Sequence, residues 1–221
     1  MEDDDDFAIS MSQAVHQPPE VTLARQAVGG SGHAHEERTR GKIYNDPIWG
    51  HIYLNPECND VIDTPQFQRL RELKQLGTSY YVFPGATHNR FEHSIGVCHK
   101  SKETVELIKA FQPELEIDKI DIQAVAYAGL CHDLGHGPFS HVFENEFLSV
   151  RLAGQEFPKH EENSAKMFDY LVDYNQLEID ADVISRVKSL ITSAEEEHGV
   201  MPKSWTHGKS FLREIVANGR N

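Results

Sequence analysis

The sequence predicts a mainly α-helical fold with a small β-hairpin near the start of its ordered part. Apolar residues recur at helical spacing in several stretches beyond residue 60, and residues that cap or break helices bound these stretches. Short β-type runs occur within residues 43–54. The 221 residues, 39% of them hydrophobic, are enough for one substantial core. We therefore expect one helical domain with a hairpin attached.

Residues 1–40 are expected to form a disordered acidic tail, and residues 41–221 the domain itself. An acidic run opens the tail, Pro18–Pro19 and Gly29–Gly32 follow, and helical or strand periodicity is lacking. The acidic start is the opposite of a signal peptide's basic start, and no apolar run approaches membrane length. These features predict a soluble, intracellular protein without a membrane partner.

The first ordered element is expected to be the hairpin. The runs Ile43–Tyr44 and His51–Leu54 flank the turn-forming segment Asn45–Pro47, and Gly50 precedes the second run. Apolar and β-branched residues on both sides of such a turn are typical of two paired strands.

The clearest helix start lies at Thr64, an N-cap candidate followed by Pro65 at the first helical position. Gly77 is expected to end this helix. Its apolar face would consist of Phe67, Leu70, Leu73 and Leu76. The polar residues off that face are Gln68, Arg69, Arg71 and Lys74. Periodicity alone predicts no more for these four than a solvated surface.

Two long helices should follow. The first runs from Arg90 to about Phe111, with Val97, Val105, Ile108 and Phe111 facing inward. The second begins after the N-cap candidate Asp118 and closes at His132–Asp133. Its exit is marked by Gly135, Gly137 and Pro138.

The remainder of the chain is expected to begin with an irregular segment over residues 139–160, which contains Glu144. Three further helical patterns follow it, at about residues 161–174, 182–197 and 210–217. The ordered part is therefore mostly helical and shows no internal repeat.

The chain is strongly acidic, with 35 Asp and Glu against 21 Lys and Arg and a formal charge of −14. Such a surface argues against nucleic-acid binding, which requires clustered cations. Phosphate ligands are still compatible, because a bound metal ion inverts the local charge. The three cysteines, Cys58, Cys98 and Cys131, form no CxxC motif, which indicates a reducing compartment.

The histidine-rich stretch 130–141 carries the chemistry. Neighbouring residues on a helix point about 100° apart, so His132 and Asp133 converge on one ion only at a helix end, with ligands added from elsewhere. His93, on the preceding helix, is such a ligand. Imidazole and carboxylate ligands suit zinc, iron, manganese or nickel better than calcium. The plain alternative is a chance His-Asp dipeptide in a loop.

Further side chains around this stretch suit a phosphate ester. His136, His141 and His160 can donate to phosphoryl oxygens or exchange protons near neutral pH. Arg90 can pair with phosphate through two hydrogen bonds. A nucleophilic mechanism through Cys131 or Ser140 ranks low, because neither residue lies in a nucleophile motif.

The pattern of His93 followed by His132–Asp133 resembles the HD superfamily of metal-dependent phosphohydrolases. Five longer stretches resemble, more specifically, the family of vertebrate SAM-and-HD-domain deoxynucleoside triphosphate triphosphohydrolases. These stretches are residues 45–48, 62–71, 80–86, 88–94 and 129–141. The resemblance extends from about Lys42 to Asn221, covers the first part of the family's catalytic domain and lacks its SAM domain.

The resemblance implies a role for each matching residue. The implied metal ligands are His93, His132 and Asp133, and the implied phosphate contacts are Arg90, His136 and His141. His160 matches the histidine of a catalytic His-Asp dyad, in which Glu144 replaces the aspartate and is one methylene longer. The residues expected to read the deoxyribose are Gln75 and Leu76. The residues expected at an allosteric nucleotide site are Lys42, Ile43, Asn45, Asp63, Gln68 and Arg71.

The implied function is metal-dependent hydrolysis of a deoxynucleoside triphosphate (dNTP) to the deoxynucleoside and inorganic triphosphate. Zinc, iron or manganese would occupy the His-Asp site, and magnesium would accompany the nucleotide. Expected partners are a dNTP substrate, a GTP or dNTP effector, and a second copy or a full-length relative. Family resemblance implies a nuclear location, with the cytoplasm as the alternative.

The family's second metal-binding aspartate would fall just past Asn221, so we expect the chain, as a truncated form, to turn over weakly or not at all. One alternative function is a non-catalytic regulator that binds nucleotide or full-length subunits. Another is an HD phosphohydrolase acting on a different phosphoester.

Overall fold

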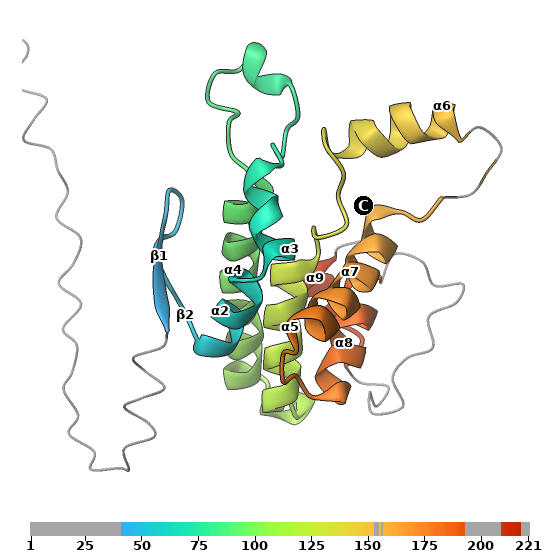
Figure 1. The fold of residues 1–221 in the computed structure, drawn as a ribbon. Helices are drawn as coiled ribbons and strands as arrows, with labels where there is room; N and C mark the ends of the chain where they lie inside the picture. The colour runs from blue at the N-terminus through green and yellow to red at the C-terminus, as the bar shows by residue number, and fades with distance from the viewer. Residues whose placement is uncertain (1–40, 153–154, 156, 193–208, 218–221) are drawn as a thin grey trace, which may run out of the picture.

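A computed structural model describes residues 41–152, 155, 157–192 and 209–217. It confirms a mainly helical fold with a two-stranded hairpin at the start of the described chain (Figure 1). None of the described helices is both long enough and apolar enough to span a bilayer. The tail expected at residues 1–40 lies outside the described residues.

The hairpin consists of β1 (Lys42–Asp46) and β2 (Gly50–Leu54), which pair antiparallel with Tyr44 opposite Ile52. Its turn is held by Asp46, whose Oδ1 accepts hydrogen bonds of 2.8 Å from the backbone N–H groups of Ile48 and Trp49. Ile52 is fully buried and anchors the hairpin on the helices. The predicted hairpin is therefore confirmed.

Helix α2 (Pro56–Ile62) leads into α3 (Pro65–Gln68), which continues as the 3₁₀ helix η1 (Arg69–Glu72). Thr64 caps α3 by accepting from the N–H of Phe67 at 3.3 Å, as predicted. The predicted extension of the helix to Leu76 is wrong, and Leu76 is 50% exposed.

The reason is a strand-like pairing with a later segment. The carbonyl of Leu73 accepts from the N–H of Arg90 at 2.9 Å, and the N–H of Gln75 donates to His88 at 3.1 Å. These bonds require an extended backbone at Leu73, which has φ −101° and ψ 101°. The segment then leads through η2 (Ser79–Tyr81) to the next helix.

Helices α4 (Arg90–Phe111) and α5 (Lys119–Cys131) form the central pair, joined through η3 (Pro113–Leu115) (Figure 1). Gly129 permits their close approach, because a Cβ there would lie only 3.2 Å from the carbonyl of Val97.

The start of α5 is capped as predicted, with the Asp118 side chain accepting from the N–H of Asp121. On α4, Val105 is buried as expected, whereas Val97 and Ile108 are only partly buried. Phe111 was predicted to face inward and is 82% exposed, because it is the last residue of α4 and extends past the packed face.

Three helices pack around α5: α7 (His160–Asn175), α8 (Ala181–Ile191) and α9 (Leu212–Val216). They agree with the three predicted patterns, although the predicted stretch beyond residue 192 lies outside the described residues. Their fully buried residues include Phe168, Leu171, Val183, Val187, Leu190 and Leu212. This core holds the end of α5 and the start of α7 in fixed positions.

The segment expected to be irregular over residues 139–160 contains a π-helix, η4 (Phe143–Leu148), followed by α6 (Ser149–Arg151). This part projects from the helical bundle (Figure 1). Several of its large apolar residues are exposed, with Val142 at 60%, Phe147 at 52% and Val150 at 72%. The helical turns were missed because they bury no continuous apolar stripe.

Candidate active site

The first turn of α4 and the end of α5 bring His93, His132 and Asp133 together. The Nε2 atoms of the two histidines lie 3.2 Å apart. Asp133 places Oδ2 3.5 Å from His93 Nε2 and Oδ1 3.4 Å from His132 Nε2. Asp133 follows directly after the helix-capping His132, which is how two adjacent residues converge on one point.

These spacings fit one bound transition-metal ion. Two ligand atoms about 2.0–2.1 Å from a zinc ion and separated by the tetrahedral angle lie about 3.3–3.4 Å apart. The 3.2 Å between the two nitrogens is close to this value, and each nitrogen has one of the two Asp133 oxygens at 3.4 or 3.5 Å. Two imidazole nitrogens and one carboxylate oxygen also form a donor set that suits zinc, iron or manganese.

The protonation states of His93 and Asp133 favour metal binding at neutral pH. Burial and the neighbouring His132 lower the pKa of His93 to about 4, so its ring is neutral. Burial acts to raise the pKa of Asp133, but His132 and Arg90 outweigh it and hold the pKa at about 2. His132 Nδ1 lies 2.8 Å from the carbonyl of Gly129, which directs its Nε2 toward the other two ligands.

Arg90 forms a buried ion pair with Asp133 from the first turn of α4. Its side chain is 4% exposed and that of Asp133 is 5% exposed. The Nε of Arg90 is buried without a hydrogen-bond partner. The guanidinium thus fixes Asp133 and keeps one donor for a further ligand.

His136, His141 and His160 form a second group, the imidazole patch. The rings of His136 and His160 stack with centroids 4.0 Å apart and planes 21° apart. His141 lies edge-on to both, at 4.9 Å from His136 and 5.1 Å from His160. Ligand atoms of the three residues lie within 4.8 Å of one another, so they too could hold a metal ion.

The stacking indicates that an anion suits the imidazole patch better than a metal ion. The nitrogens of stacked imidazoles point outward within their ring planes and not toward the neighbouring ring, which favours several oxygen acceptors over one ion held between the rings. Burial lowers the pKa of His136 to about 2, and a neutral imidazole still offers one N–H donor. Asp133 joins the two groups, since its Oδ1 is 3.5 Å from His136 Nε2.

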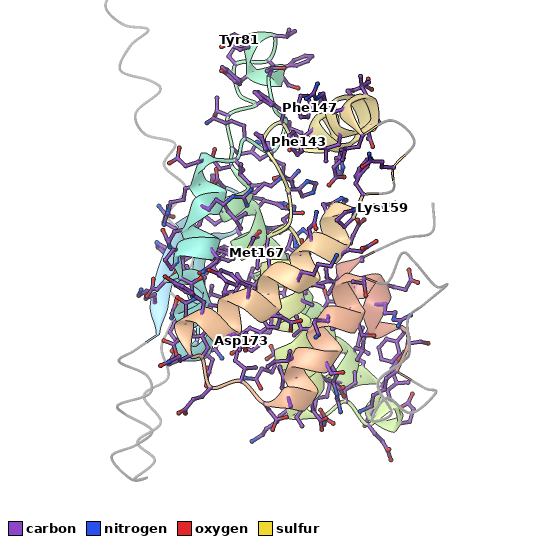
Figure 2. All side chains as sticks on the ribbon, turned by 45° about the vertical axis from the view of Figure 1, so that its right-hand side comes forward. Tyr81, Phe143, Phe147, Lys159, Met167 and Asp173 are labelled. Atoms are coloured by element: carbon purple, nitrogen blue, oxygen red, sulfur yellow. The ribbon has the colours of Figure 1, made fainter. Side chains whose placement is uncertain are left out.

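His160 begins α7 directly after Lys159, which marks that end of the helix in Figure 2. Its Nδ1 lies 3.0 Å from Glu144 Oε2 and 3.2 Å from Glu161 Oε2. The longer side chain of Glu144 therefore reaches the histidine, because η4 carries it to the right distance. Glu161 is a second carboxylate that sequence reasoning missed.

A strained turn connects the imidazole patch to the segment before α4. Phe139 and Ser140 have φ values of +63° and +57°, in the left-handed region that non-glycine residues rarely adopt. Ser140 Oγ donates to the carbonyl of Gln75 at 2.7 Å. Ser140 and Cys131 are both buried, which gives no support to either as an exposed nucleophile.

A cavity of about 1040 Å³ opens beside His93, between the hairpin turn, α4 and α9. Residues that line it include Trp49, Gln75, His93 and Phe211. Gln75 has a buried Oε1 without a hydrogen-bond partner. Of the two expected deoxyribose contacts, Gln75 therefore faces this cavity, whereas Leu76 is not among its lining residues.

The residues expected at the nucleotide effector site lie on β1 and around α3. Lys42 pairs with Asp63, and Arg71 Nε donates to Gln68 Oε1 at 2.8 Å. The Arg71 guanidinium also covers the ring of Phe91 at 3.5 Å. The two remaining residues, Ile43 and Asn45, are exposed on β1. The structure thus forms two pairs from four of the six expected residues: Lys42 with Asp63, and Gln68 with Arg71.

Two residues near the metal-binding group have contacts that the sequence did not predict. Arg69, expected to be solvated, donates from Nη1 to the carbonyl of Leu134 at 3.2 Å and from Nη2 to His136 at 2.7 Å. Ser164 donates to the carbonyl of His132 at 2.6 Å. The last carbonyls of a helix always need donors, but periodicity does not reveal which distant residue supplies them.

The chain matches the HD domain family over residues 90–214. It is also similar to proteins named deoxynucleoside triphosphate triphosphohydrolase SAMHD1. Identity is 48% over 200 residues to the Xenopus laevis protein, covering 81% of this chain and 32% of the relative. It is 46% over 192 residues to the Homo sapiens protein, covering 81% and 30%.

The Dictyostelium discoideum homolog of the same name is 46% identical over 188 residues, covering 85% of this chain and 34% of the relative. The chain thus spans about a third of the length of these relatives. The match over residues 90–214 includes the first turn of α4, the segment from the end of α5 to η4, and the start of α7, which together carry both groups of histidines. Because the family match covers more than half of the chain and includes the side chains of the site, the chain belongs to the HD domain family.

Proposed function

We propose that this site hydrolyses a deoxynucleoside triphosphate to the deoxynucleoside and inorganic triphosphate. The observation that carries the proposal is the position of Asp133, which lies between the metal-binding group and the imidazole patch. Its two oxygens are 3.5 Å from His93 Nε2 and 3.5 Å from His136 Nε2. A phosphoryl group at this point would be in reach of a metal ion and of several imidazole donors at once. The SAMHD1 relatives, named as triphosphohydrolases, supply the substrate class.

His93, His132 and Asp133 would hold the metal ion. A divalent zinc, iron or manganese ion at this position would supply Lewis-acid chemistry to the phosphoryl group and the attacking water. The chain's own contribution is to keep the His93 imidazole neutral and the Asp133 carboxylate ionised, because burial lowers the pKa of His93 and neighbouring groups lower that of Asp133.

The phosphate chain of the substrate, with its magnesium ion, would lie along Arg90 and the imidazole patch. Arg90 offers its unpartnered Nε, and His136 and His141 offer ring N–H groups. These contacts would fix the α-phosphorus near Asp133. Binding of this kind orients the reacting bond and excludes competing water.

His160 and Glu144 would manage the protons. A water oxygen bonds to the α-phosphorus, the bond from that phosphorus to the 5′-oxygen breaks, and the leaving oxygen takes a proton. The contact from His160 Nδ1 to Glu144 Oε2, 3.0 Å, keeps the other ring nitrogen free for this transfer.

The deoxyribose would contact Gln75 and Leu76, and these contacts would exclude a 2′-hydroxyl. Gln75 lines the cavity beside His93 and has a buried oxygen without a partner. Leu76 is half exposed and offers an apolar surface. Together they would favour deoxynucleotides over ribonucleotides.

A second nucleotide, GTP or a dNTP, would bind as an effector at the surface formed by β1 and α3. Asp63 and Arg71 supply opposite charges there, and Lys42 and Gln68 accompany them as partners. Ile43 and Asn45 extend the same surface along β1. A guanine edge, which both donates and accepts hydrogen bonds, fits this pair of charges.

A protein partner of the chain would be a second copy or a longer relative. The loop around η2 exposes Tyr81 at 77%, Val82 at 74% and Phe83 at 66%. Contiguous exposed apolar side chains of this kind mark interaction surfaces. The labelled Tyr81 lies at the far end of this loop (Figure 2).

The test is incubation of stoichiometric protein with dGTP and magnesium, followed by detection of inorganic triphosphate. We expect slow release by the natural sequence and by the His51→Ala control on β2, and none by His132→Ala. Equal release by His132→Ala would contradict the proposal. Binding of dGTP without product would favour the non-catalytic regulator, and cleavage of another phosphoester instead would favour the third function.

A further inference from the structure

We propose that Arg69 is a positioning residue for the metal-binding turn, defined as residues 132–137. Arg69 would act through two backbone carbonyls, without touching the metal ion or the substrate. This inference rests on the proposed metal role of His93, His132 and Asp133. Periodicity of the sequence predicted only a solvated surface for Arg69, so this role of η1 could not be inferred from the sequence.

The metal-binding turn needs outside donors because α5 ends at Cys131. Carbonyl groups at the end of a helix have no later N–H group to bind within the helix. The turn satisfies part of this need itself: the N–H of Leu134 donates to Cys131 at 3.1 Å, and that of His136 to Asp133 at 3.2 Å. The carbonyls of Leu134 and His136 are bound by a residue far away in the sequence.

Arg69 supplies both of those bonds. Its Nη1 donates to Leu134 at 3.2 Å and its Nη2 donates to His136 at 2.7 Å. The guanidinium is planar, so two donors in fixed geometry set the distance between the two carbonyls. Its positive charge also lies close to the C-terminal end of α5, where a cation is favourable. A lysine at this position could bind one carbonyl but could not span both.

The opposite side of the turn is held by α7. Ser164 Oγ donates to the carbonyl of His132 at 2.6 Å and accepts from the N–H of Gly135 at 2.8 Å. A Cβ at Gly135 would collide with the backbone of His160 and Ser164, so α7 presses directly on the turn. The metal-binding turn is therefore clamped between η1 and α7. Among the described residues of η1, Arg69 makes the side-chain hydrogen bonds to this turn.

Asp133 and His136 depend on this clamp for their orientation. Asp133 lies one residue before Leu134, and the backbone of His136 is bound by Arg69 directly. The His136 ring is 1% exposed, and its Nδ1 has no hydrogen-bond partner that would orient it. The position of the ring therefore depends on the backbone, together with the stack on His160 and the contact with Asp133. Loss of the clamp should shift both side chains without removing any of the metal ligands.

The experiment uses cobalt(II) as the probe, measured by calorimetry and by its visible absorption on the full chain well below the melting temperature. We expect Arg69→Ala to weaken cobalt binding by about 10–100-fold, as for other residues that orient metal ligands. Arg69→Lys should bind with intermediate affinity. Arg151→Ala, which removes an exposed arginine at the end of α6, is the matched control and should bind as the natural chain does.

Guanidinium ions provide a second arm that a general loss of stability would not reproduce. Arg69 is exposed to solvent at the edge of the turn, so a free ion can enter the space left by Arg69→Ala. Millimolar guanidinium chloride, far below denaturing concentrations, should restore part of the cobalt affinity, and sodium chloride of equal ionic strength should not.

The outcomes separate this inference from the proposed function. Cobalt binding that is equal in the natural chain and in His132→Ala would overturn the metal site itself. Binding that is lost in His132→Ala but unchanged in Arg69→Ala would overturn the positioning role alone. A lower melting temperature of Arg69→Ala with unchanged cobalt affinity, or with no recovery specific to guanidinium, would also overturn it.

Discussion

Arg90 and Asp133 form an ion pair at the centre of the site, with side chains only 4% and 5% exposed. The pair joins the first turn of α4 to the end of α5, and Asp133 belongs to the metal-binding group. A carboxylate buried to this degree stays ionised only because cationic and imidazole neighbours surround it. The pair therefore contributes to the fold and to the chemistry of the site.

Replacing Arg90 should be costly for stability. Arg90→Ala leaves the Asp133 carboxylate buried with its main cation removed, and such changes cost about 3–5 kcal/mol. Urea denaturation at neutral pH measures this loss. The control is Lys100→Ala, which breaks an exposed pair with Glu103 and should cost about 1 kcal/mol or less. Equal losses for the two variants would show that the Arg90–Asp133 pair does not behave as a buried pair.

The stability of the metal-free chain should fall as the pH drops from about 6.5 to about 4. Burial and His132 lower the pKa of His93 from 6.5 to about 4. In this window the unfolded state binds a proton that the folded state excludes, so acid favours unfolding. The effect of one residue has a slope of at most about 1.4 kcal/mol per pH unit.

The free energy of unfolding, measured by urea denaturation at several pH values in this range, should therefore fall less steeply with decreasing pH for His93→Gln than for the natural chain. His51→Gln, at an exposed position of β2, controls for the removal of a histidine. A His93→Gln profile that matches the natural one would show that His93 titrates normally in the folded chain.

Glu144 and Glu161 should substitute for each other in part. Glu144 Oε2 is hydrogen-bonded to His160 Nδ1 at 3.0 Å, and Glu161 Oε2 lies 3.2 Å from the same nitrogen and has no hydrogen-bond partner of its own. We expect Glu144→Gln and Glu161→Gln each to slow triphosphate release by less than about tenfold, and the double variant to slow it by about 100-fold or more. Release rates from dGTP measure the effect. If the double variant slowed release by no more than the product of the two single effects, the two glutamates would act on His160 independently, and the prediction would be wrong.

Asp63 should distinguish guanine from adenine at the proposed effector surface. Guanine can donate from its N1 and N2 positions to the Asp63 carboxylate, and adenine has no matching pair of donors on that edge. Asp63→Ala should therefore weaken GTP binding by about tenfold or more, and ATP binding much less. Calorimetry of both nucleotides checks this, with Asp60→Ala as the control for loss of a nearby exposed carboxylate. An equal loss of affinity for GTP and ATP would show that Asp63 does not recognise guanine.

Local signals in the sequence were sufficient for the helices that carry the metal ligands. The bounds of α4 and the cap of α5 at Asp118 follow from residues within a few positions of each helix end. The convergence of His132 and Asp133 follows from their location at a helix terminus. The core also follows in large part, because Phe67, Leu70 and Val105 lie at helical spacing and are buried.

Long-range contacts were beyond the reach of periodicity. The helix after Thr64 ends early because Leu73 pairs with Arg90, a partner 17 positions later that no local pattern indicates. Arg69 reaches carbonyls 65 and 67 positions away in the sequence. The turns of η4 were missed for a different reason, since a helix that projects from the bundle lacks a buried face.

The most direct test of this account is anomalous X-ray diffraction from crystals of the chain supplied with manganese or zinc. We expect one strong peak about 2.0–2.2 Å from His93 Nε2, His132 Nε2 and an Asp133 oxygen. The peak should be absent in His132→Ala crystals prepared in the same way. A strong peak in the imidazole patch formed by His136, His141 and His160, with none between His93 and Asp133, would contradict the central claim.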